Sequence, residues 1–504
     1  MIGALPEAAS LLFTWQGVLT LLFGTALGIV LGALPGIGST VAVALVLPFT
    51  LSMEQAPAIT LLLAVYAGSV YGGSVSAILI NTPGTPAAAA TVLDGTPMAR
   101  AGLAGEALGW ATLASVFAGL VSAVVLLFAA PQLAAFALRF GPIETFALIC
   151  LGLTCIVTVS KGSVVKGLVA GGLGVFLATV GGDPITGEVR YTFAQYQLIA
   201  GFNLLAVVIG IFAFSEILIR IADGVDGGGA RVAFHGLILP RLREWRGRVP
   251  TLFKSTGIGS VVGVLPGTGS TTAAFISYAE AKRSSPRGDR FGAGEPDGII
   301  AAESANNAVT GGALVPTLAL GIPGDVITAV MLATFTLHGV TPGVRLMQDN
   351  PALIAAIFLG FFVINLLLLP LGMVLSRVAA PLLRIREPLM LAAIGLLCVI
   401  GVYYVRGNPF DLIVMVFAGV AGLFLRRAGY PMAPLVIGMV LGPALELSLR
   451  QGLIITDGSI AAFVVGHPIA LVLLLMTAVG LLWPAIRALI STRQTTRERS
   501  AATD

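Results

Sequence analysis

The stretch Gly32-Ala-Leu-Pro-Gly-Ile-Gly-Ser-Thr40 interrupts an apolar run, and it recurs 231 residues later as Gly263-Val-Leu-Pro-Gly-Thr-Gly-Ser-Thr271. Proline removes a backbone donor and glycine disfavours a helix interior, so this pattern ends one helix and starts another. We therefore predict two hairpins with tips at 34–40 and 265–271. The residues that break the helix at the two tips are Pro35, Gly36, Gly38, Pro266, Gly267 and Gly269.

A second pair of motifs follows the tips in the same order. Asn81-Thr-Pro-Gly-Thr85 corresponds to Gly321-Ile-Pro-Gly-Asp325, and each motif follows a long apolar run. We predict that they interrupt two longer helical elements, 57–97 and 298–338. The breaking residues are Pro83, Gly84, Pro323 and Gly324, and the preceding Gly72-Gly73 and Gly311-Gly312 pairs also correspond. This recurrence indicates an internal duplication.

The composition assigns the class of protein. Of 504 residues, 57% are apolar and 10% are charged, and the mean hydropathy is +0.99. Soluble domains average about 25% charged residues, so an ordinary soluble enzyme is excluded and an all-α polytopic membrane protein is predicted. The three cysteines lie inside apolar runs, which favours a packing role. They are Cys150, Cys155 and Cys398.

The apolar runs predict about 11–12 transmembrane segments. The count depends on whether Leu11–Leu34 crosses the bilayer by itself. Besides the motif regions, the runs lie at 106–130, 143–159, 163–180, 198–220, 351–376, 388–404, 410–425, 432–449 and 460–484.

Basic residues gather in alternate loops, which orients the chain by the positive-inside rule. The loops 231–254 and 282–290 are both basic, so the hairpin between them should open from the cytoplasm, with arms of about ten residues, half a bilayer each. No Lys or Arg precedes Arg100, so the first hairpin should open from the outside. We expect a periplasmic N-terminus and a cytoplasmic C-terminus.

These orientations predict an inverted-topology repeat with two re-entrant hairpins and two broken helices. The first repeat is 1–230, the basic cytoplasmic loop is 231–254, the second repeat is 255–484, and a cytoplasmic tail is 485–504. Paired Gly/Pro-broken segments in two inverted halves are typical of a transporter's midplane binding site. The alternative is that the breaks are only packing kinks.

Broken helices offer two kinds of ligand group. Half-helix N-termini suit carboxylates, and hydroxyl or carbonyl oxygens suit Na⁺. The predicted substrate-binding residues are Ser39, Thr40, Asn81, Thr82, Ser270, Thr271 and Asn307. The predicted ion-coupling residues are Asp325, Glu303, Thr85 and Thr272. Asn306 and Asn307 could bind a ligand or simply hydrogen-bond neighbouring helices.

Other chemistry lacks support in the sequence. The phosphate-cradling motif of ATP-driven proteins is absent, and no His/Cys cluster suggests a metal site. We therefore expect no enzyme activity, no cofactor and no nucleic-acid partner, with Na⁺ as a possible coupling ion.

The four motifs, Leu34–Thr40, Asn81–Thr85, Leu265–Thr271 and Gly321–Asp325, resemble those of one transporter family over nearly the whole chain. The chain is similar to the large permease subunit (TctA type) of tripartite tricarboxylate transporters. The resemblance implies a bacterial inner-membrane location, a small TctB-type membrane subunit and a periplasmic TctC-type solute-binding protein. It also implies import of tricarboxylates or related organic carboxylates by Na⁺ or H⁺ symport. The alternative is a passive organic-anion channel, which would need no coupling ion.

Overall fold

The computed structural model describes residues 2–159, 163–183, 185–224, 234, 236–382 and 386–482. The chain forms two compact units. Unit 1 comprises 1–138 and 202–424, and unit 2 comprises 139–201 and 425–504. The predicted cytoplasmic tail 485–504 and the start of the basic loop 231–254 lie outside the described residues.

The described residues of unit 1 form helices and connecting segments, with no strand among them. Its first segment contains η1 (Ile2–Ala4), α1 (Leu5–Leu12), α2 (Trp15–Ala33), α3 (Gly38–Val46), η2 (Leu47–Ser52), α4 (Gln55–Ile80), η3 (Pro86–Ala88), α5 (Ala89–Met98), η4 (Ala99–Leu103) and α6 (Ala104–Ala137). Its second segment contains α9 (Leu204–Ile209), η6 (Gly210–Phe214), α10 (Ser215–Asp223), η7 (Leu242–Trp245), α11 (Val249–Val264), α12 (Gly269–Ser284), η8 (Gly288–Arg290), α13 (Pro296–Leu320), α14 (Val326–Leu337), α15 (Val344–Asp349), α16 (Pro351–Leu382), α17 (Glu387–Arg406) and α18 (Pro409–Arg427), which ends just inside unit 2.

The helices α4 and α13 form the core of unit 1, since nearly every residue of both is buried. Glycines let their neighbours approach closely. A Cβ on Gly28 of α2 would lie 2.7 Å from the carbonyl of Val65 in α4, and one on Gly259 of α11 would lie 2.3 Å from that of Ala305 in α13. The pairs α2–α4 and α11–α13 therefore pack backbone against backbone, as small residues allow in membranes.

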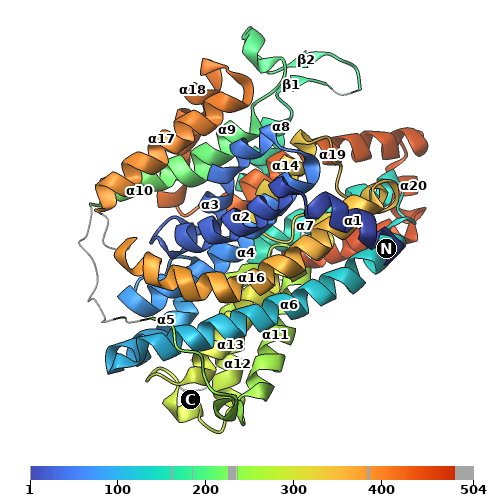
Figure 1. Cartoon of the computed structure of the whole chain (residues 1–504). Helices are drawn as coiled ribbons and strands as arrows, with labels where there is room; N and C mark the ends of the chain where they lie inside the picture. Colours follow the sequence, from blue (N-terminus) through green and yellow to red (C-terminus); the bar gives the residue numbers. More distant parts are fainter. Residues whose placement is uncertain are drawn as a thin grey trace, which may run out of the picture. The chain divides into compact units, whose positions relative to one another are not determined.

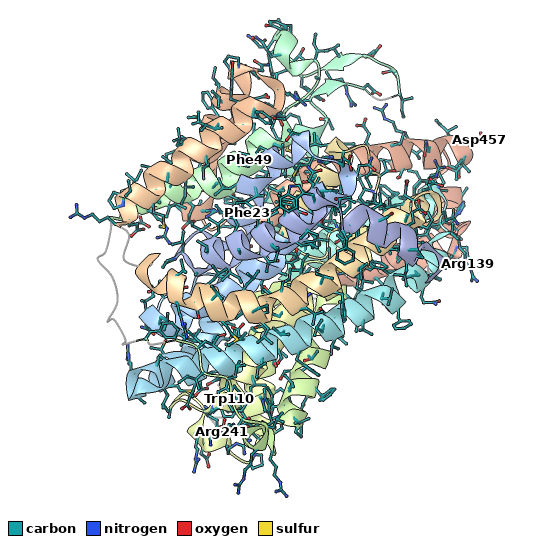
Figure 2. The ribbon with its side chains drawn as sticks, viewed as in Figure 1. Phe23, Phe49, Trp110, Arg139, Arg241 and Asp457 are labelled. Atoms are coloured by element: carbon teal, nitrogen blue, oxygen red, sulfur yellow. The ribbon has the colours of Figure 1, made fainter. Side chains whose placement is uncertain are left out.

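The outer helices of unit 1 expose apolar side chains. Figure 1 shows α16 and α6 running side by side, and the two helices are in contact. Phe23 is 62% exposed and Phe49 is 44% exposed, and both are labelled in Figure 2. Exposed side chains of this kind suit contact with lipid.

Unit 2 contains α7 (Pro142–Val159), α8 (Val164–Ala178), η5 (Tyr196–Leu198), α19 (Met432–Ile455) and α20 (Ile460–Val465). Its β1 (Gly181–Gly182) and β2 (Val189–Arg190) form an antiparallel hairpin. The helices α8 and α19 pack through Gly174, whose Cβ would lie 1.9 Å from the carbonyl of Leu435. The hairpin is held by ion pairs, since Asp183 contacts Arg450 at 2.8 Å and Arg190 contacts Glu446 at 2.7 Å.

The predicted all-α polytopic class is confirmed. Eight helices in the described residues are long and apolar enough to cross a membrane, and five shorter apolar helices accompany them. The exact number of crossings, the orientation and the repeat boundaries stay predictions.

Two local expectations were wrong. The arms α11 and α12 have 16 residues each, longer than the ten expected, because both helices continue into polar residues beyond the apolar run. The run 460–484 is not one helix, because α20 ends at Val465 and a second apolar helix begins at Pro468.

Candidate functional site

The two hairpin tips have the same backbone conformation. Gly36 and Gly38 have φ of +83° and +63°, and Gly267 and Gly269 have φ of +85° and +67°. Only glycine adopts this region without strain. The turns end α2 and α11, and they place Ser39 and Ser270 in the first turns of α3 and α12.

The second pair of motifs also repeats its backbone. The helix α4 is capped at its C-terminus by Asn81, with φ of +57°, and α13 by Gly321, with φ of +71°. After each break, the side chain of Thr85 or Asp325 caps the next helical segment by accepting a hydrogen bond from the N–H three residues later. The predicted interruptions of both long helices are therefore present.

Each helix break contacts the hairpin of its own half. The N–H of Gly267 donates to the carbonyl of Gly324 at 2.7 Å, and a Cβ on Gly84 would lie 2.0 Å from the carbonyl of Gly32. Elements of one half also contact elements of the other half. The helix α3 contacts α14, and α12 contacts η3 and α5. Both tips and both breaks therefore meet inside unit 1.

Asp325 is a buried carboxylate at one of these breaks. Its Oδ2 accepts a hydrogen bond from the Tyr66 hydroxyl at 2.6 Å, and its Oδ1 accepts one from the Thr328 N–H at 2.7 Å. The Thr328 hydroxyl, 2.9 Å from Oδ1, completes the capping arrangement.

Glu303, in the middle of α13, is the second buried carboxylate of this region. It accepts hydrogen bonds from the hydroxyl of Thr91, from that of Ser115 at 3.2 Å, and from the amide of Asn307 at 3.3 Å. Among the described residues, neither Glu303 nor Asp325 forms an ion pair with a Lys, Arg or His. Buried charges normally have such a partner, and a buried carboxylate without one favours a bound proton or cation.

The predicted residues divide between these clusters. Asn307 lies with Glu303, hydrogen-bonded to Ser115 at 2.8 Å, and Ser39 is buried with its hydroxyl unpartnered. Half-buried positions near the tips and breaks are held by Thr40, Thr82, Ser270, Thr271 and Thr272. Asn81 is exposed at the end of α4. The structure therefore brings the hairpin hydroxyls near the breaks but turns Asn81 outward.

Several residues of the site were missed by sequence reasoning. Tyr66 is absent from the predicted site residues, yet its hydroxyl donates a hydrogen bond to Asp325. Thr328 had a signal, since Asp-x-x-Thr is the pattern of a capping pair. Arg220 of α10 packs its guanidinium against Gly36 and pairs with Glu387 at 2.5 Å, although no basic residue lies within either motif.

Most of the chain is similar in sequence to known proteins. The family described as the tripartite tricarboxylate transporter TctA family matches residues 18–437. An Agrobacterium vitis protein, described as an uncharacterized 52.8 kDa protein in the TAR-I ttuC' 3' region, is 41% identical over 472 residues, 93% of each chain. A second one, described as an uncharacterized protein in the TAR-II ttuC' 3' region, is 39% identical over 233 residues, covering 46% of this chain and 96% of the relative.

No solved structure matches the chain. The family match covers the hairpin tips, the broken helices and both buried carboxylates. The chain therefore belongs to the tripartite tricarboxylate transporter TctA family.

Proposed function

We propose that this chain is the permease of a binding-protein-dependent secondary transporter. It imports tricarboxylates or related organic carboxylates across the bacterial inner membrane by symport with Na⁺ or H⁺. Its partners are a small TctB-type membrane subunit and a periplasmic TctC-type binding protein. The family supports the permease role. The observation that carries the mechanism is the pair of buried carboxylates, Glu303 and Asp325, beside Gly/Pro-broken helices.

The buried carboxylates explain why a cation takes part. A charged side chain at the bilayer centre costs at least about 2.5–3.5 kcal/mol, and Glu303 has only neutral hydrogen-bond partners. A proton or Na⁺ at Glu303 removes this cost. The hydroxyl oxygens of Thr91 and Ser115 suit a hard cation such as Na⁺.

The helix N-termini at the tips and breaks suit the substrate. The uncapped N–H groups of a helix N-terminus bind anions, and they carry positive partial charge. Ser39, Thr40, Ser270 and Thr271, in the first turns of α3 and α12, supply hydroxyl donors for carboxylate oxygens. Movement of one broken-helix bundle against the other then exposes the site to alternate sides.

The test is uptake of labelled citrate into proteoliposomes that contain the chain, its small subunit and a loaded binding protein. Na⁺ and proton gradients are imposed separately. We expect accumulation against a citrate gradient that collapses with one of the two ion gradients. Glu303→Gln should abolish uphill accumulation while allowing equilibration, because the amide carries no charge to neutralise. Glu188→Gln, at an exposed position of unit 2, serves as the matched control.

A different result would contradict symport. If wild-type citrate uptake only equilibrates and ignores both gradients, the chain is a passive organic-anion channel. If Glu303→Gln accumulates citrate as the wild type does, coupling does not pass through Glu303.

A further inference from the structure

Around the breaks, the helices of the first half of unit 1 pack against each other at the same positions as the corresponding helices of the second half. The Cβ of Gly28 in α2 would meet Val65 and Gly68 of α4, and that of Gly259 in α11 would meet Ala305 and Ala308 of α13. Val65 therefore corresponds to Ala305 and Gly68 to Ala308, and the two residues of each pair are 240 positions apart in the sequence. This register differs by one residue from the pairing of Gly72-Gly73 with Gly311-Gly312 predicted from the sequence.

The same register pairs the residues of the breaks. Tyr66 corresponds to Asn306, Thr85 to Asp325, and Ala88 to Thr328. In the second half, the Asp325 carboxylate joins the Tyr66 hydroxyl to the N–H of Thr328. In the first half, the corresponding groups are the Asn306 amide and the N–H of Ala88, and the residue between them is Thr85, which has no carboxylate.

Asn306 is the unusual member of this set. It is 1% exposed, yet neither its Nδ2 nor its Oδ1 has a hydrogen-bond partner. An unsatisfied polar group at such depth costs free energy. The side chain lies close to the Glu303 carboxylate, and its amide keeps unused hydrogen-bonding capacity for a ligand.

Contacts along α13 show where Asn306 faces. Gly298 lies against Asp94, and one turn later Ala302 belongs to the same small buried cluster as Ala90 and Ala87. The two helices thus run antiparallel, and one further turn along this face brings Asn306 to the level of Pro86. This residue starts the helical segment that Thr85 caps. Because α13 contacts η3, this register directs the buried amide toward that helix N-terminus.

We propose that a substrate carboxylate binds at this point, in the place that corresponds to the Asp325 carboxylate of the other half. Its oxygens accept hydrogen bonds from Asn306 Nδ2, the Thr85 hydroxyl and the N–H of Ala88. That N–H has only a long contact of 3.4 Å with the Thr85 hydroxyl and a backbone bond of 3.1 Å. Thr85 thereby serves the substrate, whereas the sequence predicted a role in ion coupling.

The site also accounts for coupling. Glu303 precedes Asn306 by one turn of α13, and like charges one turn apart repel. A second carboxylate enters favourably only after the Glu303 charge is neutralised. Substrate and coupling cation therefore bind together. This inference rests on the proposed function, since it names where that function's carboxylate is held.

The experiment measures ligand-induced stabilisation of the purified full-length chain in detergent. Melting temperatures are recorded with citrate, tricarballylate and succinate in the presence of Na⁺ at neutral pH. The wild type is compared with Asn306→Ala, with Thr85→Asp, and with Ser304→Ala as control. Ser304 lies on the same helix, and it is equally buried and unpartnered.

We expect one or more of these acids to stabilise the wild type and Ser304→Ala. Asn306→Ala should bind about ten- to a hundredfold more weakly, which is the effect of losing one hydrogen bond to a charged group. Thr85→Asp should lose the stabilisation entirely, because the new carboxylate occupies the substrate's place as Asp325 does in the other half. Equal stabilisation of all four proteins would overturn the site and leave the carboxylate permease intact.

A second measurement covers the case in which none of the acids stabilises the wild type. The double variant Thr85→Asp with Asn306→Ala completes a mutant cycle, which isolates the coupling between the two positions. Asn306→Ala could lower the melting temperature more in the Thr85→Asp background than in the wild type. This result would support a carboxylate-binding position between Asn306 and Thr85, and it would show that the proposed substrate class is wrong. If the effects of the two substitutions on the melting temperature are additive, the carboxylate-binding position itself is refuted.

Discussion

The carboxylates of this chain have two kinds of partner. Glu303 and Asp325 are buried among neutral donors, so a mobile cation or proton can neutralise them reversibly. Asp183 in unit 2 has fixed partners instead, because it contacts Arg450 at 2.8 Å and Arg190 at 3.3 Å. The first kind suits a transport cycle, and the second kind holds a loop in place.

Asp183 leads to a prediction about pH. Hydrogen bonds from the Ile185 and Thr186 N–H groups and from Arg450 lower the pKa of Asp183 from 3.8 to about 2. A lowered pKa in the folded state contributes stability at pH values above the unfolded pKa and loses it as the pH falls through the folded one. We therefore expect the segment 181–201 to loosen between about pH 4 and pH 2.

Pepsin cleavage within 181–201 checks this prediction, because the segment exposes Tyr191, Phe193 and Tyr196. Asp183→Asn should be cut rapidly already at pH 4, where the wild type resists. Asp457→Asn removes a carboxylate from an exposed position of the same unit and should behave like the wild type at each pH. Equal cleavage of all three proteins would contradict a role for the Asp183 charge.

Residue types and spacing identified only part of the candidate site. Asp325 and Glu303 could be selected because ionisable groups in apolar helices are rare. Tyr66 could not be selected, since an aromatic residue in a buried helix is normally packing. The hydrogen-bond partners of Glu303 could not be predicted from the sequence either, because Thr91 and Ser115 lie 212 and 188 residues away in the chain. Such contacts depend on how helices pack.

Glycine spacing on α11 leads to a prediction about helix packing. An added Cβ at Gly259 would lie 2.3 Å from the carbonyl of Ala305, whereas one at Gly257 would meet nothing within 4 Å. Gly259→Ala should force α11 and α13 apart and cost about 1–3 kcal/mol. Gly257→Ala should be neutral, or stabilising by about 0.5–1 kcal/mol, because alanine favours a helix.

Melting temperatures of the two variants in detergent check this difference. The pair is matched because both glycines belong to α11 and receive the same methyl group. A Gly259→Ala protein as stable as Gly257→Ala would show that α11 and α13 do not pack at this distance.

The positions of the helix breaks could be predicted from the sequence, but the lengths of the helices could not. Pro-Gly pairs mark a helix end by local chemistry, so the interruptions after α2, α4, α11 and α13 could be placed from the sequence. The start of α11 at Val249 was missed because hydropathy counts only the apolar part of a helix. Pro250 in its first turn is favoured at a helix start and was the better signal.

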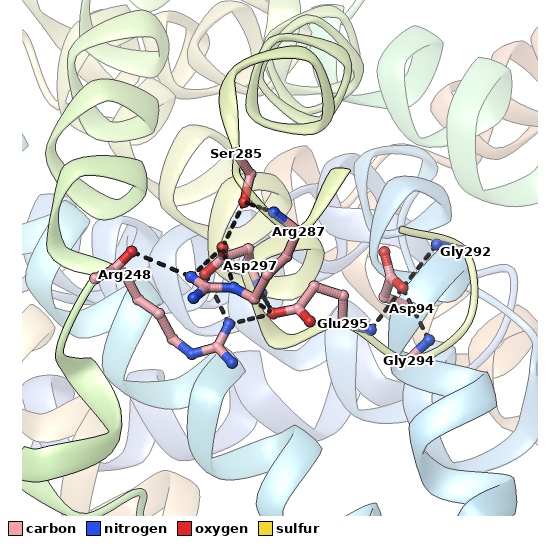
Figure 3. A network of polar contacts seen from close by, with 9 residues as sticks. Asp94, Arg248, Ser285, Arg287, Gly292, Gly294, Glu295 and Asp297 are labelled. Carbon is pink, nitrogen blue, oxygen red and sulfur yellow. Dashed lines mark hydrogen bonds and ion pairs between the residues drawn. The ribbon is translucent and has the colours of Figure 1, made fainter. Parts of the chain in front are cut away.

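A buried carboxylate links distant parts of unit 1. Figure 3 shows Asp94 of α5 facing the loop before α13, where its Oδ1 accepts hydrogen bonds from the N–H groups of Gly292, Gly294 and Glu295 at 2.8, 2.9 and 2.8 Å. Arg248 and Arg287 pair with Asp297 beside it, at 2.8 and 2.7 Å. This network ties α5, the start of α11 and the start of α13 together.

Asp94→Asn should release the loop, because an amide forms weaker bonds to three N–H groups than a carboxylate does. We expect faster hydrogen exchange at 292–295 and a stability loss of about 1.5–3 kcal/mol for a hydrogen bond to a charged group. Asp289→Asn, at an exposed position in the same loop region, is the charge-matched control. Unchanged exchange at 292–295 in Asp94→Asn would show that the loop is held by other contacts.

The division of unit 2 into two chain segments has a consequence for biosynthesis. The helices α7 and α8 leave the ribosome before their partner α19, and the segment 202–424 of unit 1 is made in between. At 5–20 residues per second, this interval lasts roughly 10–45 s. During that time the close-packing surface of α8 at Gly174 has no native partner. A nascent chain that stops before residue 432 therefore exposes an unfinished helix pair to membrane quality-control proteases.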